Sequence, residues 1–294
     1  MIKFGLALRN TGPGSSAEAI EAGAETAERL GWETVWTTDH VLVPRSAGAE
    51  YGRAFEAIVT LAWVGARHPG LRLATSVIVV PQRNAVLLAK ELATLDALSE
   101  GRLIVGVGVG WNETEFANVG AADRFHRRGA YLDETIRLWR HLWSGASEPF
   151  AGDFHSFSDF VFGPLPAQRG LVPIVVGGSS PAALRRAGAL GDGYHPTRTG
   201  PELMAQRIPA IRAAAEAAGR PMPRLSARVA VKAERVEGGG YSLSGDPQAM
   251  ARDIRAFEGL GVDHLALVFD ATEPAQLVAA IERFDSEVVR AVGG

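Results

Sequence analysis

An aspartate and a histidine stand side by side, as Asp39 and His40, after a short apolar run at 34–37. A histidine exchanges a proton near neutral pH, and an adjacent carboxylate can orient its ring or bias its charge. We therefore predict that His40 acts as a general acid or base with Asp39 beside it. The alternative is a histidine that is hydrogen-bonded within the wall of the fold. No H-x-H or H-E-x-x-H spacing occurs, so we expect no metal site.

A glycine-rich strand is predicted at 103–109. Three glycines alternate along it and just beyond it: Gly106, Gly108 and Gly110. They would leave one side of the strand bare, so that a flat group could lie against the backbone. Trp111 and Asn112 would follow at the carboxyl end, where α/β folds bind ligands. The alternative is that the glycines only relieve crowding. A dinucleotide fingerprint is excluded, because G-x-G-x-x-G would need glycine at position 111.

A second glycine motif, Gly177-Gly178-Ser179, follows an apolar run at 173–176. Ser180 and Pro181 come next, and this pair is typical of a helix N-cap followed by proline. Exposed amides in front of a helix N-terminus suit a phosphate. The alternative is a plain turn between a strand and a helix.

A polar interruption, Thr75-Ser76-Val77, lies inside the apolar strand predicted at 71–79. Buried hydroxyl groups need hydrogen-bond partners. A neighbouring backbone or a bound ring could provide them, so we include Thr75, Ser76 and Val77 among the candidate binding residues.

Short apolar segments alternate with helical segments along the whole chain, and these elements must position the residues above. Eight strands are predicted, at 2–8, 34–37, 71–79, 103–109, 173–176, 191–195, 225–231 and 264–269. A helix follows each of them and no linker interrupts the alternation. This pattern predicts a (β/α)8 TIM barrel that occupies 1–294 as a single domain, with loop insertions at its carboxyl face.

One segment breaks this rhythm, from Glu148 to Gly170. Five phenylalanines alternate roughly with polar residues there, which indicates a hairpin insertion. Together with Trp111, this insertion suggests an apolar wall for a substrate, and it could shield the mouth of the barrel.

The composition limits the kinds of molecule that the protein is expected to bind. Thirty basic and thirty-three acidic residues give a net charge of −3, which argues against binding to nucleic acid or to an anionic membrane. The chain has no cysteine, so disulfides and thiolate chemistry are excluded. No signal peptide and no apolar run of membrane-spanning length are found, and we expect a cytoplasmic protein.

The order of these motifs resembles the luciferase-like family of barrels, and in particular its coenzyme F420-dependent branch. The resemblance covers nearly the whole chain. The motifs that carry it are Thr38–His40, Ala74–Arg83, Ala89–Asp96, Gly101–Trp111, Val175–Gly178 and Gly191–Tyr194.

The resemblance implies a flavin or deazaflavin at the carboxyl mouth of the barrel. Members often have a non-proline cis peptide in strand three, under the ring, and Ser76-Val77 matches that place. The loop Gly177-Gly178-Ser179 would hold the phosphate-bearing tail, and His40 would lie near the reactive edge of the ring. The glycine-rich strand would pack beneath the cofactor, with Trp111 and Asn112 at the rim.

These features predict an oxidoreductase that moves a hydride between F420 and a small organic substrate, while His40 gives or takes the proton. The ring supplies the redox chemistry, and the protein supplies placement and polarity. An FMN-dependent monooxygenase of the same family is the first alternative. A barrel that binds the cofactor without turnover is the second. We also expect a small-molecule substrate and a homodimer.

Overall fold

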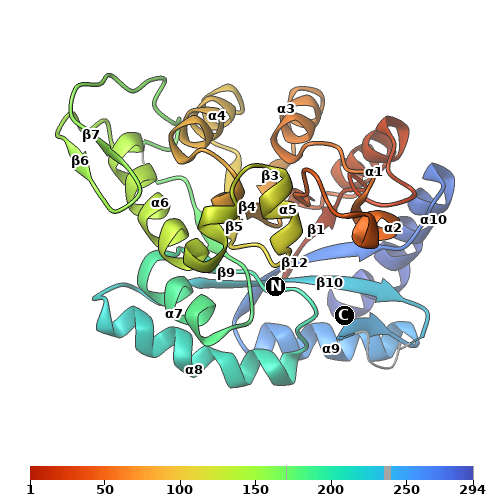
Figure 1. Ribbon diagram of the computed structural model, residues 1–294. Helices are drawn as coiled ribbons and strands as arrows, with labels where there is room; N and C mark the ends of the chain where they lie inside the picture. Colours follow the sequence, from red (N-terminus) through yellow and green to blue (C-terminus); the bar gives the residue numbers. More distant parts are fainter. Residues whose placement is uncertain (170, 235–239, 294) are drawn as a thin grey trace.

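Eight parallel strands close into a barrel in the computed structural model, which describes residues 1–169, 171–234 and 240–293 (Figure 1). β1 pairs with both β12 and β2, and β9 pairs with both β8 and β10, so the ring of strands closes. The barrel strands are β1 (Lys3–Ala7), β2 (Thr34–Thr37), β3 (Arg72–Thr75), β5 (Leu103–Gly108), β8 (Ile174–Val176), β9 (Gly193–Tyr194), β10 (Arg224–Lys232) and β12 (Val262–Phe269). The predicted TIM barrel is confirmed.

Two short strands extend this sheet at the carboxyl end of the barrel. β4 (Ile78–Val79) resumes the line of β3 after Ser76 and Val77 and pairs with β5. β11 (Ser242–Ser244) pairs in parallel with the end of β10. Both extensions lengthen the wall on the side where ligands bind in barrels of this kind.

Helices surround the barrel (Figure 1). The longer helices of the described residues are α1 (Ala17–Arg29), α3 (Ala57–Arg67), α4 (Ala85–Leu98), α6 (Arg128–Trp143), α7 (Pro181–Leu190), α8 (Pro201–Ala217), α9 (Pro247–Gly259) and α10 (Pro274–Phe284). The shorter ones are α2 (Gly48–Tyr51), α5 (Glu113–Asn118), α11 (Arg290–Gly293), the 3-10 turns at Arg45–Ala47, Val80–Gln82 and Ala122–Arg127, and a π-turn at Asp285–Val289. None of the described helices has the length and apolarity that crossing a membrane requires.

The main core lies between the barrel and its helices. Trp139 and Trp143 of α6 are fully buried one turn apart, and their indole N–H groups donate to Ala85 and Ala89 of α4, at 2.9 and 3.0 Å. Each buried indole therefore keeps a hydrogen bond, as buried tryptophans need.

A smaller apolar cluster fills the barrel itself. It consists of Trp36 on β2, Ala74 on β3, Val175 on β8 and Ala266 on β12. Because β8 and β12 are not neighbours of β2 and β3 in the sheet order β12-β1-β2-β3-β5-β8, these side chains meet only across the barrel interior. The interior is thus packed, and space for a ligand is left only at an end.

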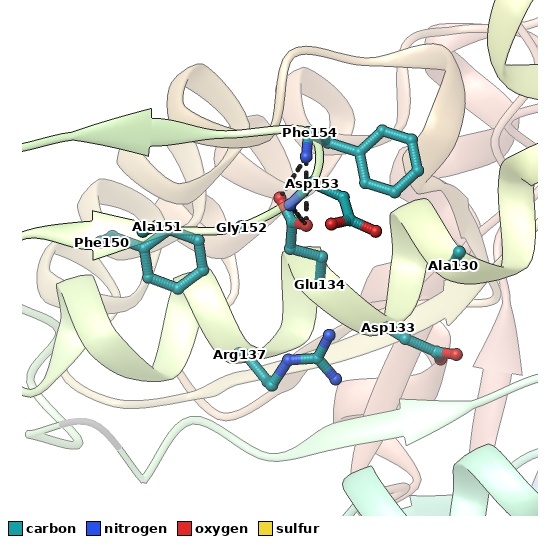
Figure 2. Close-up of a pocket in the computed structure, with 9 residues that line it drawn as sticks. All are labelled: Ala130, Asp133, Glu134, Arg137, Phe150, Ala151, Gly152, Asp153 and Phe154. Atoms are coloured by element: carbon teal, nitrogen blue, oxygen red, sulfur yellow. Dashed lines mark hydrogen bonds between the residues drawn. The ribbon is translucent and has the colours of Figure 1, made fainter.

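The predicted insertion contains a hairpin of β6 (Phe150–Ala151) and β7 (Ser156–Phe157). The carboxylate of Glu134, on α6, accepts hydrogen bonds from the turn amides of Asp153 and Phe154, at 2.6–3.1 Å (Figure 2). It also accepts from the amide of His155, at 2.8 Å. The hairpin is therefore attached to the flank of α6, and residues of both line a pocket (Figure 2).

This attachment corrects one expectation. The segment follows α6 and precedes β8, so it connects a helix to the amino end of a strand, and its rings contact His141 of α6. It covers helices rather than the mouth of the barrel, and it does not supply the apolar wall or the shield. The last residue of the predicted insertion, Gly170, lies outside the described residues.

Candidate active site

The carboxylate that contacts His40 belongs to Glu115. Nδ1 of His40 lies 3.1 and 3.3 Å from the two oxygens of Glu115, and the amide of Val41 donates to the same carboxylate at 2.9 Å. The side chains of His40 and Glu115 are only 8% and 2% exposed. A carboxylate held this way fixes both the place and the orientation of the imidazole.

The charge of Glu115 determines which nitrogen of His40 is available. Burial raises the pKa of Glu115, but the hydrogen bonds from His40 and Val41 outweigh it and hold the pKa below its usual value. An ionised carboxylate can only accept hydrogen bonds, so the network assigns the proton of neutral His40 to Nδ1. Nε2 is then the nitrogen that can take up or, once protonated, deliver a proton.

Glu115 was not among the residues predicted from the sequence, although a signal was present. Asn112 and Glu115 have the N-x-x-E spacing that resembles a capping box, in which the acidic residue turns back to the N-cap amide. Asn112 does cap α5 and accepts the amide of Glu115 at 3.1 Å. The carboxylate instead reaches His40 and Val41. Asn112 therefore contributes by fixing the helix that carries Glu115.

Asp39 has different partners. Its carboxylate accepts the amide of Val79 at 2.9 Å and the guanidinium of Arg83 at 2.6 Å, and Arg83 also binds Glu56 at 2.7 Å. Burial lowers the pKa of Arg83, but the charges of Asp39 and Glu56 overcome this and raise it above the usual value. Asp39 thus ties the end of β2 to β4, and its predicted action on His40 stays a prediction.

Two aromatic rings cover His40. The centre of the Tyr51 ring lies 4.1 Å from the centre of the imidazole ring. The centre of the Trp111 ring lies 6.5 Å from it, and the two rings are nearly edge-on. Trp111 is 61% exposed, and its predicted contact with a cofactor stays a prediction. The structure thus brings His40 and Trp111 together from loops about 70 residues apart in sequence.

The peptide bond between Ser76 and Val77 is cis, as the resemblance implied. Ser76 is held from β2, from β10 and from the residue after β9. Its amide donates to Thr37 at 2.7 Å, its carbonyl accepts from Arg228 at 3.2 Å, and its hydroxyl lies 3.0 Å from Nε2 of His195. Thr75 is fully buried, and its hydroxyl bonds both backbone groups of Gly106. The hydroxyl of Thr75 therefore has the neighbouring backbone as its partner, and direct contact of Thr75 with a cofactor stays a prediction.

The glycine-rich strand makes room for Val77. A Cβ on Gly108 would lie 2.6 Å from a methyl group of Val77, and one on Gly177 would lie 2.9 Å from the other methyl group. A Cβ on Gly106 would lie 1.8 Å from the carbonyl oxygen of Thr75. The expectation that a flat group lies directly on these glycines is therefore wrong. A ligand at the mouth would meet half-buried Val77 first.

Gly110 serves the turn after the strand. Its φ of +74° is a left-handed conformation that favours glycine. A Cβ there would also lie 2.6 Å from Val79 and 2.8 Å from Phe116. Gly110 thus lets the chain turn from β5 into the helix that carries Glu115.

The second glycine motif stands at the start of α7. Gly178, with a φ of +106°, and Ser179 are exposed, and Ser180 caps the helix. The amide of Gly177 donates to Val107 at 2.9 Å, so this amide is not free for a phosphate. The hydroxyl of Tyr194 donates to Gly178 at 2.9 Å and in turn accepts from Arg207. Of the three predicted residues, Gly178 and Ser179 remain as exposed residues that could bind an anion there.

Three arginines approach the same end of the barrel from three strands. Arg9 follows β1, Arg198 follows β9, and Arg228 lies on β10, where it binds the carbonyl of Ser76. Burial lowers the pKa of Arg228, and the charges of Arg9 and Arg198 add to the effect. The nearest acid to Arg9 is the exposed Asp270, at 4.0 Å, and Nε of Arg9 is buried without a hydrogen-bond partner among the described residues.

Known proteins resemble the chain throughout its length. The family model of luciferase-like monooxygenases matches residues 2–238. An F420-dependent glucose-6-phosphate dehydrogenase of Kineococcus radiotolerans is 32% identical over 273 residues, which cover 90% of this chain and 77% of the relative.

Two solved structures share the fold. One is an F420-dependent secondary alcohol dehydrogenase in complex with an F420-acetone adduct, with a TM-score of 0.81, 20% identity and 99% of both chains covered. The other is the oxygenating constituent of 3,6-diketocamphane monooxygenase of Pseudomonas putida in complex with FMN. Its TM-score is 0.79, with 15% identity and 98% of both chains covered.

Proposed function

The chain belongs to the luciferase-like monooxygenase family, and from this premise we propose that it is an F420-dependent oxidoreductase. It would move a hydride between the deazaflavin and a small organic substrate. The relative of Kineococcus radiotolerans, named for F420, supports this choice of cofactor. The observation that carries the proposal is the pair of His40 and buried Glu115 beside the Ser76–Val77 segment. It provides a held proton donor or acceptor at the end of the barrel.

The residues at the mouth fit such a cofactor. Val77 offers a half-buried apolar surface on a segment held from β2, from β10 and from the residue after β9, and exposed Gly178 and Ser179 suit a phosphate at the start of α7. When bound, F420 supplies the hydride-transfer chemistry. Nε2 of His40 takes up or delivers the matching proton, and Glu115 compensates the charge of the imidazolium while His40 is protonated.

The FMN-dependent monooxygenase is the second candidate, and the FMN complex with the same fold supports it. Oxygen chemistry on a flavin requires that water be kept from the site. Trp111 is 61% exposed at the rim, and the phenylalanine-rich hairpin lies on α6. An open mouth favours F420, because a deazaflavin does not readily activate oxygen.

The substrate would carry an anionic group. Arg9, Arg198 and Arg228 bring three positive charges to the same end of the barrel, and a phosphate would offset their mutual repulsion. A phosphorylated sugar is therefore the first compound to assay, as the name of the relative also suggests.

The assembly would be a homodimer. Large apolar side chains are exposed on two adjacent helices, namely Val59 and Trp63 on α3 and Val86 and Leu87 on α4. Light scattering after gel filtration measures the mass directly, and a monomer at micromolar concentration would contradict this part of the proposal. The cytoplasmic location is checked by cell fractionation.

Paired titrations with F420 and FMN test the function, because the two cofactors absorb at different wavelengths. We expect tight binding of F420, followed by a change in its absorbance when glucose 6-phosphate is added. His40→Asn should keep the binding and lose the turnover, whereas His126→Asn is the control, since His126 is 82% exposed. Binding of FMN alone would favour the monooxygenase. Binding of F420 without turnover of any reducible or oxidisable compound would favour the non-catalytic barrel.

A further inference from the structure

His195 is a buried histidine that the proposed reaction does not use. It follows β9 directly, is 2% exposed, and stacks on Trp36 with 4.2 Å between the ring centres and 5° between the planes. Nε2 lies 3.0 Å from the hydroxyl of Ser76, and Nδ1 lies 2.8 Å from the hydroxyl of Ser226. The imidazole thus bridges two hydroxyl groups from opposite sides.

The network fixes the tautomer of this ring. Burial, and with it the nearby charges of His264 and Arg228, lowers the pKa of His195 well below its usual value, so the ring is neutral. The hydroxyl of Ser226 has two acceptors in reach, Nδ1 of His195 at 2.8 Å and the carbonyl of Tyr194 at 3.3 Å. Only donation to Tyr194 lets both of these contacts and that of Ser76 with Nε2 be hydrogen bonds at once, so the proton of Ser226 is assigned to Tyr194. The oxygen of Ser226 can therefore only accept from His195, which places the imidazole proton on Nδ1. Nε2 is then an acceptor, and the hydroxyl of Ser76 must donate to it.

The other polar groups of Ser76 are held independently of His195. Its amide is bound by Thr37 and its carbonyl by Arg228. Two strands thus fix the backbone position of Ser76. His195 determines only the direction of its hydroxyl proton. Ser76 as a residue keeps 7% of its surface exposed.

We propose that His195 is a positioning residue for Ser76. Its Nε2 accepts the hydroxyl proton of Ser76 in a hydrogen bond that points into the barrel interior, so that Ser76 presents only acceptor lone pairs to the cofactor. This inference rests on the proposed function, in which the ring lies on the Ser76–Val77 segment. A ligand atom that meets Ser76 then finds an acceptor, never a donor.

This property discriminates between the two candidate rings. Oxidised FMN carries an acceptor nitrogen at the ring position where the deazaflavin carries a C–H group. Where that ring position meets Ser76, an acceptor nitrogen would gain no hydrogen bond and would be repelled, whereas a C–H group would be tolerated. His195 would therefore favour F420 over FMN without touching either ring.

The tautomer is measured on the wild-type protein. Nitrogen-15 NMR of protein labelled at histidine distinguishes a protonated Nδ1 from a protonated Nε2. We expect one buried histidine, assigned by its loss in His195→Gln, to be neutral at neutral pH with the proton on Nδ1. A proton on Nε2, or a charged ring, would overturn the inference whether or not any cofactor binds.

The preference is measured by titration with F420 and FMN. His195→Leu removes the acceptor at Nε2 and frees the proton of Ser76. We expect the F420-to-FMN affinity ratio to fall about fivefold, the effect of roughly one hydrogen bond. In a Ser76→Ala background the same change should leave the ratio unmoved, because no hydroxyl remains to be oriented. His195→Gln, which can offer an amide oxygen to Ser76, should restore part of the ratio.

The matched control is His264→Leu. His264 is also buried and binds the indole of Trp36 at 3.1 Å, but it lies at the start of β12, at the amino end of the barrel. It should lower stability without moving the ratio. An equal change of ratio in His264→Leu, or none in His195→Leu, would overturn the inference. A wild-type protein that binds neither cofactor would overturn the proposed function instead, while the tautomer remains measurable.

Discussion

Gly108→Ala tests how the mouth of the barrel is built. A Cβ on Gly108 would lie 2.6 Å from Cγ2 of Val77, while its next neighbours are at 3.7 and 3.9 Å. Carbon atoms pack at about 3.5–4.0 Å, so Val77 must move by roughly 1 Å. Gly177 lies close to the other methyl group of Val77, so Val77 can shift only toward its exposed side. Over-packing of this kind costs about 1–3 kcal/mol, and we expect about 2 kcal/mol here.

The variant should lose both stability and affinity. Urea unfolding should show the lower free energy, and titration with F420 should show at least about tenfold weaker binding, because the displaced Val77 enters the space of the ring. Val77→Ala in the same chain removes the clashing methyl groups. The double variant should therefore be less unstable than the sum of the two single changes predicts.

Gly259→Ala is the matched control. Gly259 ends α9, and an added Cβ would meet nothing within 4 Å. Alanine favours a helix, so stability should stay the same or rise by less than about 1 kcal/mol. If Gly108→Ala is as stable as the wild type and binds F420 equally well, the glycines do not serve Val77 and the reasoning is refuted.

Three further predictions concern proton transfer, the cofactor tail and pH. His40→Asn should lower kcat by about 10²–10⁴-fold. Glu115→Gln should lower kcat by about 10–100-fold, because a charge-assisted hydrogen bond becomes a neutral one. A variant whose kcat equals that of the wild type in a steady-state assay would disprove the role of that residue. Gly178→Val should weaken F420 binding at least about tenfold, since its φ of +106° disfavours a branched residue; unchanged binding in the titration would move the phosphate elsewhere. His264 above all holds the pKa of Glu33 at about 2, so Glu33 stabilises the fold above its unfolded pKa, and this contribution is lost as pH falls through 2. Glu33→Gln should therefore lower the free energy of unfolding by about 1 kcal/mol at neutral pH and by less in acid. If urea unfolding shows the same difference between wild type and variant at every pH, this prediction is wrong.

The sequence by itself determined the barrel. Alternation of short apolar strands with amphipathic helices is a local property, because each element buries one face against its neighbours and its residues repeat accordingly. The eight predicted strands are all present, from β1 to β12. Cap signals are local in the same sense, and Ser180 does cap α7.

The sequence also indicated which strand ends would carry the site. His40, Ser76 and Gly178 each follow or interrupt an apolar strand, and the closure of a parallel barrel brings such ends to one face. What each residue contacts there could not be read from its immediate neighbours. Asp39 precedes His40 in the chain, yet its carboxylate binds Arg83, 44 residues away.

Only the tertiary structure decided the partners. Glu115 reaches His40 across 75 residues, Val77 fills the space left by Gly108 and Gly177, and His195 orients Ser76 across 119. The barrel decides these pairs because its closure sets which strands are neighbours and which side chains meet across the interior. Burial then decides their protonation, since a charge without a partner is costly away from water. Periodicity records which face of an element is buried, but not which distant group is buried beside it.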